Sequence, residues 1–177
     1  LPDMPSAIRR LRQAVATGER ILIFGDSDVD GLTASAIVSE LLRSHGARVV
    51  VRISNRVEDG YGFPAGFLAR LVRANIGLVI LLDCGTNPPE EVRALGRAGI
   101  ETIIIDHHVP TRIAAPQALI NPYLGDGHGR ELCTAGLALK LAQAWDGARP
   151  LDHYVDVAAV GTLADYAPLL GENRMFI

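Results

Sequence analysis

The fold is decided by residues 21–31, which read Ile21-Leu22-Ile23-Phe24-Gly25-Asp26-Ser27-Asp28-Val29-Asp30-Gly31. The four apolar residues at the start form a continuous run, which is typical of a strand buried on both faces of a parallel sheet. The aspartates that follow interrupt this run and lead into residues 32–44, whose apolar spacing predicts a helix. A buried strand, an acidic turn and a helix in this order indicate the start of an α/β fold.

The same alternation of apolar runs and helical spacing continues along the chain. It predicts strands at 48–53, 78–82, 102–105 and 118–120, and helices at 8–16, 64–74, 88–98, 132–145 and 152–164. Strands that alternate with helices favour a parallel arrangement. We therefore expect one α/β domain over residues 1–177, with a mostly parallel β-sheet flanked by helices on both faces.

The composition is that of a globular protein with a sizeable core. Hydrophobic residues make up 49% of the 177 and the net charge is −3, whereas a disordered chain is less hydrophobic and more highly charged. No apolar run approaches the roughly 20 residues of a membrane span. Cys84 and Cys133 are too few for a disulfide framework, which predicts a cytoplasmic protein. The charge argues against a wholly basic nucleic-acid coat, but nucleic acid stays open as a partner.

Acidic residues directly follow three of the predicted strands. Asp26 and Asp28 come after the first strand, Asp83 after the third, and an Asp-His-His triplet at 106–108 after the fourth. Ligands of open parallel sheets bind beyond the carboxyl ends of the strands, so these side chains are expected to converge. Crowded carboxylates repel one another, and their pKa values rise unless a cation neutralises them. The sequence therefore predicts a metal site.

The mixture of carboxylates and imidazoles indicates which ions would bind and what they would do. Such donors suit manganese, iron or zinc better than calcium or magnesium alone. The ligands are numerous enough for two ions about 3.5–4 Å apart that share one carboxylate. A pair of ions lowers the pKa of a bound water, holds a phosphate and stabilises the attacking and leaving oxygens. These properties predict a phosphoesterase.

Each motif also has a plainer interpretation. Residues 26–31 resemble the start of a calcium-binding EF-hand loop, but Ile37 stands where that loop has a glutamate, and a strand replaces the helix before it. An acidic turn that caps the following helix, with Asp30 as the cap, is a second alternative. Asp83 alone fits a turn after a strand, and Cys84 is expected to be a small buried residue, not a nucleophile. The three motifs together favour the metal site.

These motifs resemble those of the DHH phosphoesterase superfamily, which is named for a triplet like the one at 106–108. Within it the likeness is to the RecJ-type single-stranded-DNA-specific 5′–3′ exonucleases, and it covers nearly the whole chain. Residues 25–31 are similar to the first family motif, Asp83 to the second, and 161–169 to the fourth. Residues 55–62 and 171–174 are similar to further stretches of the RecJ type.

The resemblance implies two divalent ions, manganese or alternatively magnesium. The expected metal ligands are Asp26, Asp28, Asp83, His107 and Asp165. Asp26 and Asp83 would hold one ion, and Asp83 would bridge it to a second ion held with Asp28, His107 and Asp165.

The resemblance also implies roles for the residues around the ions. The expected catalytic residues are Asp83, His107 and His108. His108 and Arg56 are expected to contact the scissile phosphate. Asp30 and Asp106 are expected to hold the metal ligands in place without binding the ions themselves.

The implied activity is hydrolysis of single-stranded DNA by two-metal-ion catalysis, in DNA repair and recombination. Two other functions stay open: a phosphodiesterase for oligonucleotides or cyclic dinucleotides, and a non-catalytic scaffold of the same fold. The sequence departs from the family pattern at Phe24, where some members have a histidine, and at Cys84, where RecJ-type proteins have asparagine or histidine. We also expect the family's C-terminal DHH-associated domain as a partner of the same full-length protein, absent from these 177 residues.

Overall fold

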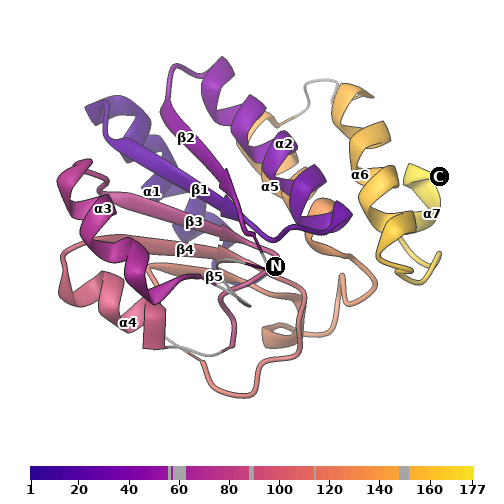
Figure 1. Ribbon diagram of the computed structural model, residues 1–177. Helices are drawn as coiled ribbons and strands as arrows, with labels where there is room; N and C mark the ends of the chain where they lie inside the picture. Colours follow the sequence, from indigo (N-terminus) through magenta and orange to yellow (C-terminus); the bar gives the residue numbers. More distant parts are fainter. Residues whose placement is uncertain (56, 58–62, 88–89, 114, 148–151) are drawn as a thin grey trace.

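The computed structural model describes residues 1–55, 57, 63–87, 90–113, 115–147 and 152–177 (Figure 1). Within these residues the centre is a sheet of five parallel strands in the order β2-β1-β3-β4-β5. The strands are β1 (Arg20–Gly25), β2 (Arg48–Ile53), β3 (Leu78–Leu82), β4 (Glu101–Ile105) and β5 (Ala118–Ile120). The predicted parallel sheet is confirmed.

Helices cover both faces of the sheet, as predicted (Figure 1). Their bounds are α1 (Met4–Thr17), α2 (Val29–Ser44), α3 (Leu68–Arg73), α4 (Glu90–Arg97), α5 (Thr134–Asp146), α6 (Asp152–Ala164) and α7 (Asn173–Phe176), with 3₁₀ turns at Ala65–Phe67 and Pro122–Leu124. α1, α2 and α5 lie on one face, and α6 packs against α2 and α5. α3 and α4 cover the other face. Among the described helices, none combines the length and the apolar character that crossing a bilayer requires.

The continuous apolar run in β1 is explained by these two layers. Successive strand residues point to opposite faces. Ile21 and Ile23 pack with the helices α1, α2 and α5, whereas Leu22 and Phe24 pack with α3 and α4. Both faces are therefore buried, and no polar residue can alternate with the apolar ones.

The order of the strands brings the three acidic motifs together. The chain turns from β1 to β2 on one side and to β3 on the other, so the topological switch point lies between β1 and β3. The backbone N–H groups of Asp26, Asp83 and Asp106 each donate, at 3.1 Å, to the carbonyl oxygen of the last residue of the neighbouring strand. The three aspartates therefore leave the sheet at the same level of its carboxyl edge.

The structure corrects two interpretations of the first motif. α2 begins at Val29, and its cap is Asp28, whose carboxylate accepts the backbone N–H of Gly31 at 3.0 Å. The alternative in which Asp30 caps this helix is wrong. The EF-hand interpretation is wrong as well, because β1 precedes the motif and Ile37 is buried against the sheet inside α2.

Other boundaries differ by short stretches. The helix predicted at 64–74 is a 3₁₀ turn followed by the shorter α3. No helix was predicted where α7 lies. The predicted start of a helix at 88 lies outside the described residues, which resume with α4 at Glu90.

Gly161 allows α6 to lie close to α2 and α5. A Cβ atom at this position would stand 2.6 Å from Cβ of Ala135 and 3.3 Å from Oδ1 of Asp30, and it would also overlap Oγ1 of Thr33. Only a residue without a side chain fits there, and the approach carries the end of α6 toward the carboxyl edge of the sheet.

Gly161→Ala is expected to lower the free energy of unfolding by about 1–3 kcal/mol, because the added methyl group forces the three helices apart. Gly96→Ala is the matched control, since a Cβ atom at Gly96 in α4 would meet nothing within 4 Å. This variant is expected to be unchanged or stabilised by up to about 1 kcal/mol. Urea denaturation of both variants measures the difference, and equal effects would contradict the packing role of Gly161.

Candidate metal centre

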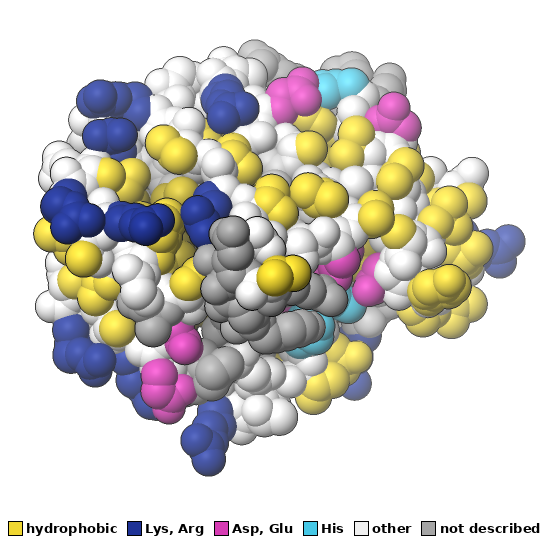
Figure 2. All heavy atoms as spheres, in the orientation of Figure 1, with side chains coloured by type: hydrophobic (Ala, Val, Ile, Leu, Met, Phe, Trp, Pro, Cys, Tyr) yellow, Lys and Arg dark blue, Asp and Glu magenta, His cyan; other side chains and the backbone are white. Residues whose placement is uncertain are grey.

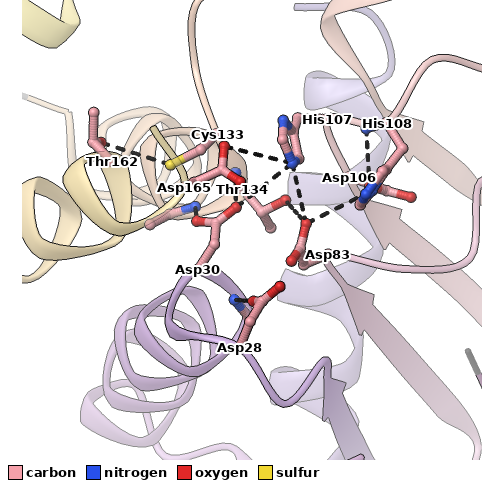
Figure 3. Close-up of polar contacts among 12 residues, drawn as sticks. Asp28, Asp30, Asp83, Asp106, His107, His108, Cys133, Thr134, Thr162 and Asp165 are labelled. Atoms are coloured by element: carbon pink, nitrogen blue, oxygen red, sulfur yellow. Dashed lines mark hydrogen bonds and ion pairs between the residues drawn. The ribbon is translucent and has the colours of Figure 1, made fainter. Parts of the chain in front are cut away.

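Asp83 lies directly after β3 at the centre of the candidate site (Figure 3). It is 2% exposed, and its φ of 60° lies in the left-handed region, which aspartate tolerates better than most residues. The hydroxyl of Thr134 donates to its Oδ1 at 3.0 Å, and Nε2 of His107 lies 3.4 Å from the same oxygen. Nδ1 of His108 lies 3.8 Å from it. A strained backbone persists where the surroundings determine it, so these contacts help to hold the carboxylate in place.

Asp26 and Asp28 come from the turn between β1 and α2. Asp26 is buried, and its Oδ1 accepts a 2.7 Å hydrogen bond from the hydroxyl of Ser54. Asp28 is exposed. Gly31 lets α2 begin close to this turn, since a Cβ atom there would stand 2.5 Å from the backbone oxygen of Asp26. One ligand atom from each of Asp26, Asp28 and Asp83 lies within 4.8 Å of the others.

Asp30 is held by the N-terminus of α5. Its Oδ2 and Oδ1 accept the backbone N–H groups of Thr134 and Ala135, both at 2.7 Å. These donors have no partner within their own helix, and the helix dipole favours a negative charge at this end. Oδ2 of Asp30 also lies 3.9 Å from Nε2 of His107. Asp30 therefore ties α2 to α5 beneath the site, and its supporting role stays a prediction.

Asp165 reaches the site from the end of α6. Its Oδ2 lies 3.9 Å from Nε2 of His107, and these two residues form a group with Asp30 whose ligand atoms lie within 4.8 Å of one another. His107 also forms such a group with Asp83 and His108. Of the three groups found among the described residues, two include Asp83 and two include His107. The groups therefore make up one continuous site.

Asp106 forms a close pair with His108. Nδ1 of His108 donates to Oδ1 of Asp106 at 2.7 Å, and the backbone N–H groups of His108 and Thr86 donate to the same carboxylate at 3.1 Å. Burial alone would raise the pKa of Asp106, but the hydrogen bond and the charge of His108 outweigh it, so the pKa is lowered. The hydrogen bond to Asp106 in turn raises the pKa of His108 to about 9. His108 is therefore an imidazolium at neutral pH, with a side chain 46% exposed.

The carboxylates of Asp83 and Asp165 have no imidazolium partner as close as the one that His108 provides to Asp106. Burial raises the pKa of Asp83 to about 7 against the opposing hydrogen bond with His107, and the carboxylates of Asp30 and Asp28 add to the rise. Burial also raises the pKa of Asp165. Burial lowers the pKa of His107, but the hydrogen bond with Asp83 and the charges of the nearby carboxylates outweigh it, so the net shift is upward.

A divalent cation fits this arrangement. It would replace the protons that the crowded carboxylates otherwise retain. The combination of carboxylate oxygens and imidazole nitrogens suits manganese, iron or zinc. The predicted ligands Asp26, Asp28, Asp83, His107 and Asp165 all belong to the ligand groups described above.

The site opens to the surface. Figure 2, in the orientation of Figure 1, shows acidic and histidine side chains close together to the right of the centre, with hydrophobic side chains beside them. Asp28 and His108 are both exposed. A ligand can therefore approach the candidate metal ligands from solvent.

Sequence reasoning missed two residues that support the site. Asn121 is fully buried after β5, where its Nδ2 donates to the carbonyl oxygen of His108 at 2.9 Å and its Oδ1 accepts the backbone N–H of Tyr123 at the same distance. A polar residue after a short strand was the signal that could have identified it. Thr134, the second, stands 51 positions after Asp83, and no sequence pattern links the two.

Three further predictions concern residues around the cluster. Phe24 packs in the core beside α3 and α4, with its ring centroid 5.0 Å from that of Phe63, so no imidazole reaches the site from this position. Cys84 is buried, as predicted, and burial raises the pKa of its thiol. Arg56, predicted on the phosphate, lies outside the described residues, together with 58–62 of the motif at 55–62.

The free energy of unfolding of the metal-free protein is expected to fall, relative to that of Asp83→Asn, as the pH rises from about 5 to about 7. The pKa of Asp83 is raised to about 7 in the folded state, so the folded protein keeps a proton that the unfolded chain has released. Retention of this proton stabilises the folded state, and the benefit is lost as the pH approaches the folded pKa.

Urea denaturation in EDTA at several pH values checks this expectation. Asp83→Asn is the reference because its side chain cannot ionise and asparagine also tolerates the left-handed region. Parallel pH profiles for the two proteins would show that Asp83 does not titrate in this window.

Comparisons with known proteins show the family to which the chain belongs. Residues 20–162 match the family described as DHH family, N-terminal domain. The chain is 37% identical over 180 residues to the single-stranded-DNA-specific exonuclease RecJ of Thermus thermophilus, an alignment that covers 100% of this chain and 27% of that protein. It is 34% identical over 178 residues to RecJ of Bacillus subtilis, which covers 99% of this chain and 22% of that protein.

A crystal structure of exonuclease RecJ bound to manganese superposes with a TM-score of 0.92 at 36% identity, covering 99% of this chain and 46% of that chain. The chain thus spans 27% and 22% of the length of the two curated relatives above. The family match contains all three strand ends that carry the acidic motifs. The chain belongs to the DHH family, and its residues 20–162 correspond to the N-terminal domain of that family.

Proposed function

We propose that the chain is the catalytic domain of a metal-dependent phosphodiesterase that hydrolyses single-stranded DNA from its 5′ end, in DNA repair and recombination. The observation that carries this proposal is the overlap of the ligand groups, in which Asp83 and His107 are each shared. Shared ligands allow two ions to lie close together, which is the arrangement used for in-line displacement at phosphorus. The substrate rests on the likeness to the RecJ exonucleases, which are named as specific for single-stranded DNA. The direction rests only on the resemblance of the sequence motifs to the RecJ type.

The family likeness divides the proposed ligands between two ions, while the geometry groups Asp28 with Asp26 and Asp83. Asp26 and Asp83 are proposed for the first ion, whereas Asp28, Asp83, His107 and Asp165 are proposed for the second. Manganese is favoured by the imidazole in this set, with magnesium as the alternative. Once bound, the ions supply Lewis-acid stabilisation of the phosphate and acidify a water molecule.

His108 is proposed to bind the scissile phosphate. Its side chain is exposed at the mouth of the site, and Asp106 keeps it positively charged at neutral pH. The imidazolium can therefore offer its Nε2–H and a positive charge to a phosphoryl oxygen as negative charge develops there. Arg56 is proposed as a second phosphate contact on the strength of the family likeness alone.

The proposal treats residues 1–177 as one catalytic domain of a longer cytoplasmic protein. The RecJ relatives extend well beyond the aligned region. A C-terminal DHH-associated domain is proposed to supply the surface on which bases stack, since only 5% of this chain is aromatic and stacking is a main source of affinity for single strands. The chain alone is therefore expected to act slowly and to release its substrate often.

Manganese is expected to raise the melting temperature of this chain by about 5–10 °C at an ion concentration about 100 times Kd. Asp83→Asn is expected to abolish the shift because both proposed ions lose a ligand. Asp126→Asn is the matched control, since the side chain of Asp126 is 79% exposed in a loop. Differential scanning calorimetry with and without manganese measures the shift, and elemental analysis counts the ions. An undiminished shift in Asp83→Asn would contradict the proposed site.

His108→Ala is expected to lower kcat on single-stranded DNA by about 10²–10³-fold, because one charge that stabilises the transition state is lost. His128→Ala should leave kcat unchanged, since its side chain is 92% exposed in the 125–129 loop. The assay follows manganese-dependent release of nucleotides from a labelled single strand and from its duplex.

The outcomes of this assay separate the proposed function from its alternatives. Preference for long single strands supports the proposal. Cleavage restricted to fragments of a few nucleotides would indicate an oligonucleotide phosphodiesterase instead. Bound ions without any hydrolysis, in this chain and in the longer protein, would indicate a scaffold.

A further inference from the structure

Thr134 contacts two of the carboxylates that build the site. It is the first residue of α5 and is fully buried. Its backbone N–H donates to Oδ2 of Asp30 at 2.7 Å, and its side-chain hydroxyl donates to Oδ1 of Asp83 at 3.0 Å (Figure 3). A single residue therefore joins the first acidic motif to the second.

The carboxylate of Asp83 has two sides with different neighbours. Its Oδ1 faces Nε2 of His107 at 3.4 Å, while Figure 3 shows its other oxygen on the side of Asp28. The backbone of Asp83 fixes where the side chain starts, but the terminal torsion of an aspartate is soft and broadly distributed. The orientation of the carboxylate plane must therefore be set by its hydrogen-bond partners.

We infer that Thr134 is a positioning residue that fixes the orientation of the Asp83 carboxylate, the ligand that the two proposed ion sites would share. This inference rests on the proposed function and names a residue that controls the bridging ligand. The hydroxyl is well suited to the task, because the β-branched side chain of threonine has few rotamers and the burial of Thr134 excludes competing water.

The hydroxyl of Thr134 has no evident structural task at the start of α5. Two backbone donors at the helix start, those of Thr134 and Ala135, already donate to Asp30. The N-cap residue, Cys133, makes no capping bond with its side chain. The helix is therefore anchored through its backbone, which leaves the hydroxyl to Asp83.

The test compares Thr134→Val, which keeps the shape but removes the hydroxyl, with Thr134→Ser, which keeps the hydroxyl. Calorimetric titration with manganese chloride is expected to show an affinity about 10–100-fold weaker for Thr134→Val, as is typical when a partner of a metal ligand is lost. Thr134→Ser is expected to stay within about threefold of the unmodified chain. Electron paramagnetic resonance is expected to show two exchange-coupled manganese ions in the unmodified chain and in Thr134→Ser, but isolated ions in Thr134→Val.

Thr102→Val is the matched control. Thr102 is buried in β4, and its hydroxyl has no hydrogen-bond partner among the described residues, so the substitution removes a buried hydroxyl without touching the cluster. Its manganese affinity and spectrum should match those of the unmodified chain. Thermal unfolding in EDTA establishes that each variant folds. If Thr134→Val does not fold, Thr134→Ala replaces it, with the same expected loss of manganese affinity and of the coupled spectrum.

Unchanged affinity and unchanged coupling in a folded Thr134→Val or Thr134→Ala would overturn the role of Thr134 while leaving the metal site intact. Failure of Thr134→Ser to restore the coupled spectrum would overturn it as well. Absence of manganese binding in the unmodified chain would instead overturn the proposed function, together with this inference.

Discussion

The constraint on which the site depends is the crowding of buried negative charge at the carboxyl edge of the sheet. Asp26, Asp83 and Asp106 leave three adjacent strands at one level, because each continues the hydrogen-bonded ladder by one bond. In a parallel sheet the residues that follow the strands must lie near one another, since the carboxyl ends of all strands meet at the same edge. Each carboxylate then needs a partner that offsets the loss of water.

The structure meets this need in different ways for different aspartates. Asp106 and Asp83 are almost equally buried, yet the pKa of Asp106 is lowered and that of Asp83 is raised to about 7. Asp106 has a close imidazolium and two backbone donors, and Asp30 has the N-terminus of α5. Asp83 has one hydroxyl and two more distant histidines. The carboxylate of Asp83 is therefore the least stabilised of the three, and a cation beside it would be stabilised most.

Close packing of the helices brings in the remaining members of the cluster. Gly31 allows α2 to begin against the backbone of Asp26, and Gly161 allows α6 to lie against α2 and α5. The end of α6 then places Asp165 beside His107. The same glycines that allow the helices to pack closely thus set the distances within the site, so stability and the geometry of the candidate metal site depend on shared contacts.

The sequence by itself determined the parallel sheet and the strand ends that carry Asp26, Asp83 and Asp106, because the pattern of apolar runs and the acidic residues after them are local features. The sequence left the cap of α2 open, with Asp30 as one alternative, since three aspartates in one turn offer several possible caps and only the backbone geometry selects Asp28. Thr134 and the orientation of Asp83 were decided by the tertiary structure alone. Their contact joins residues 51 positions apart, and it forms only when α5 packs beside the sheet.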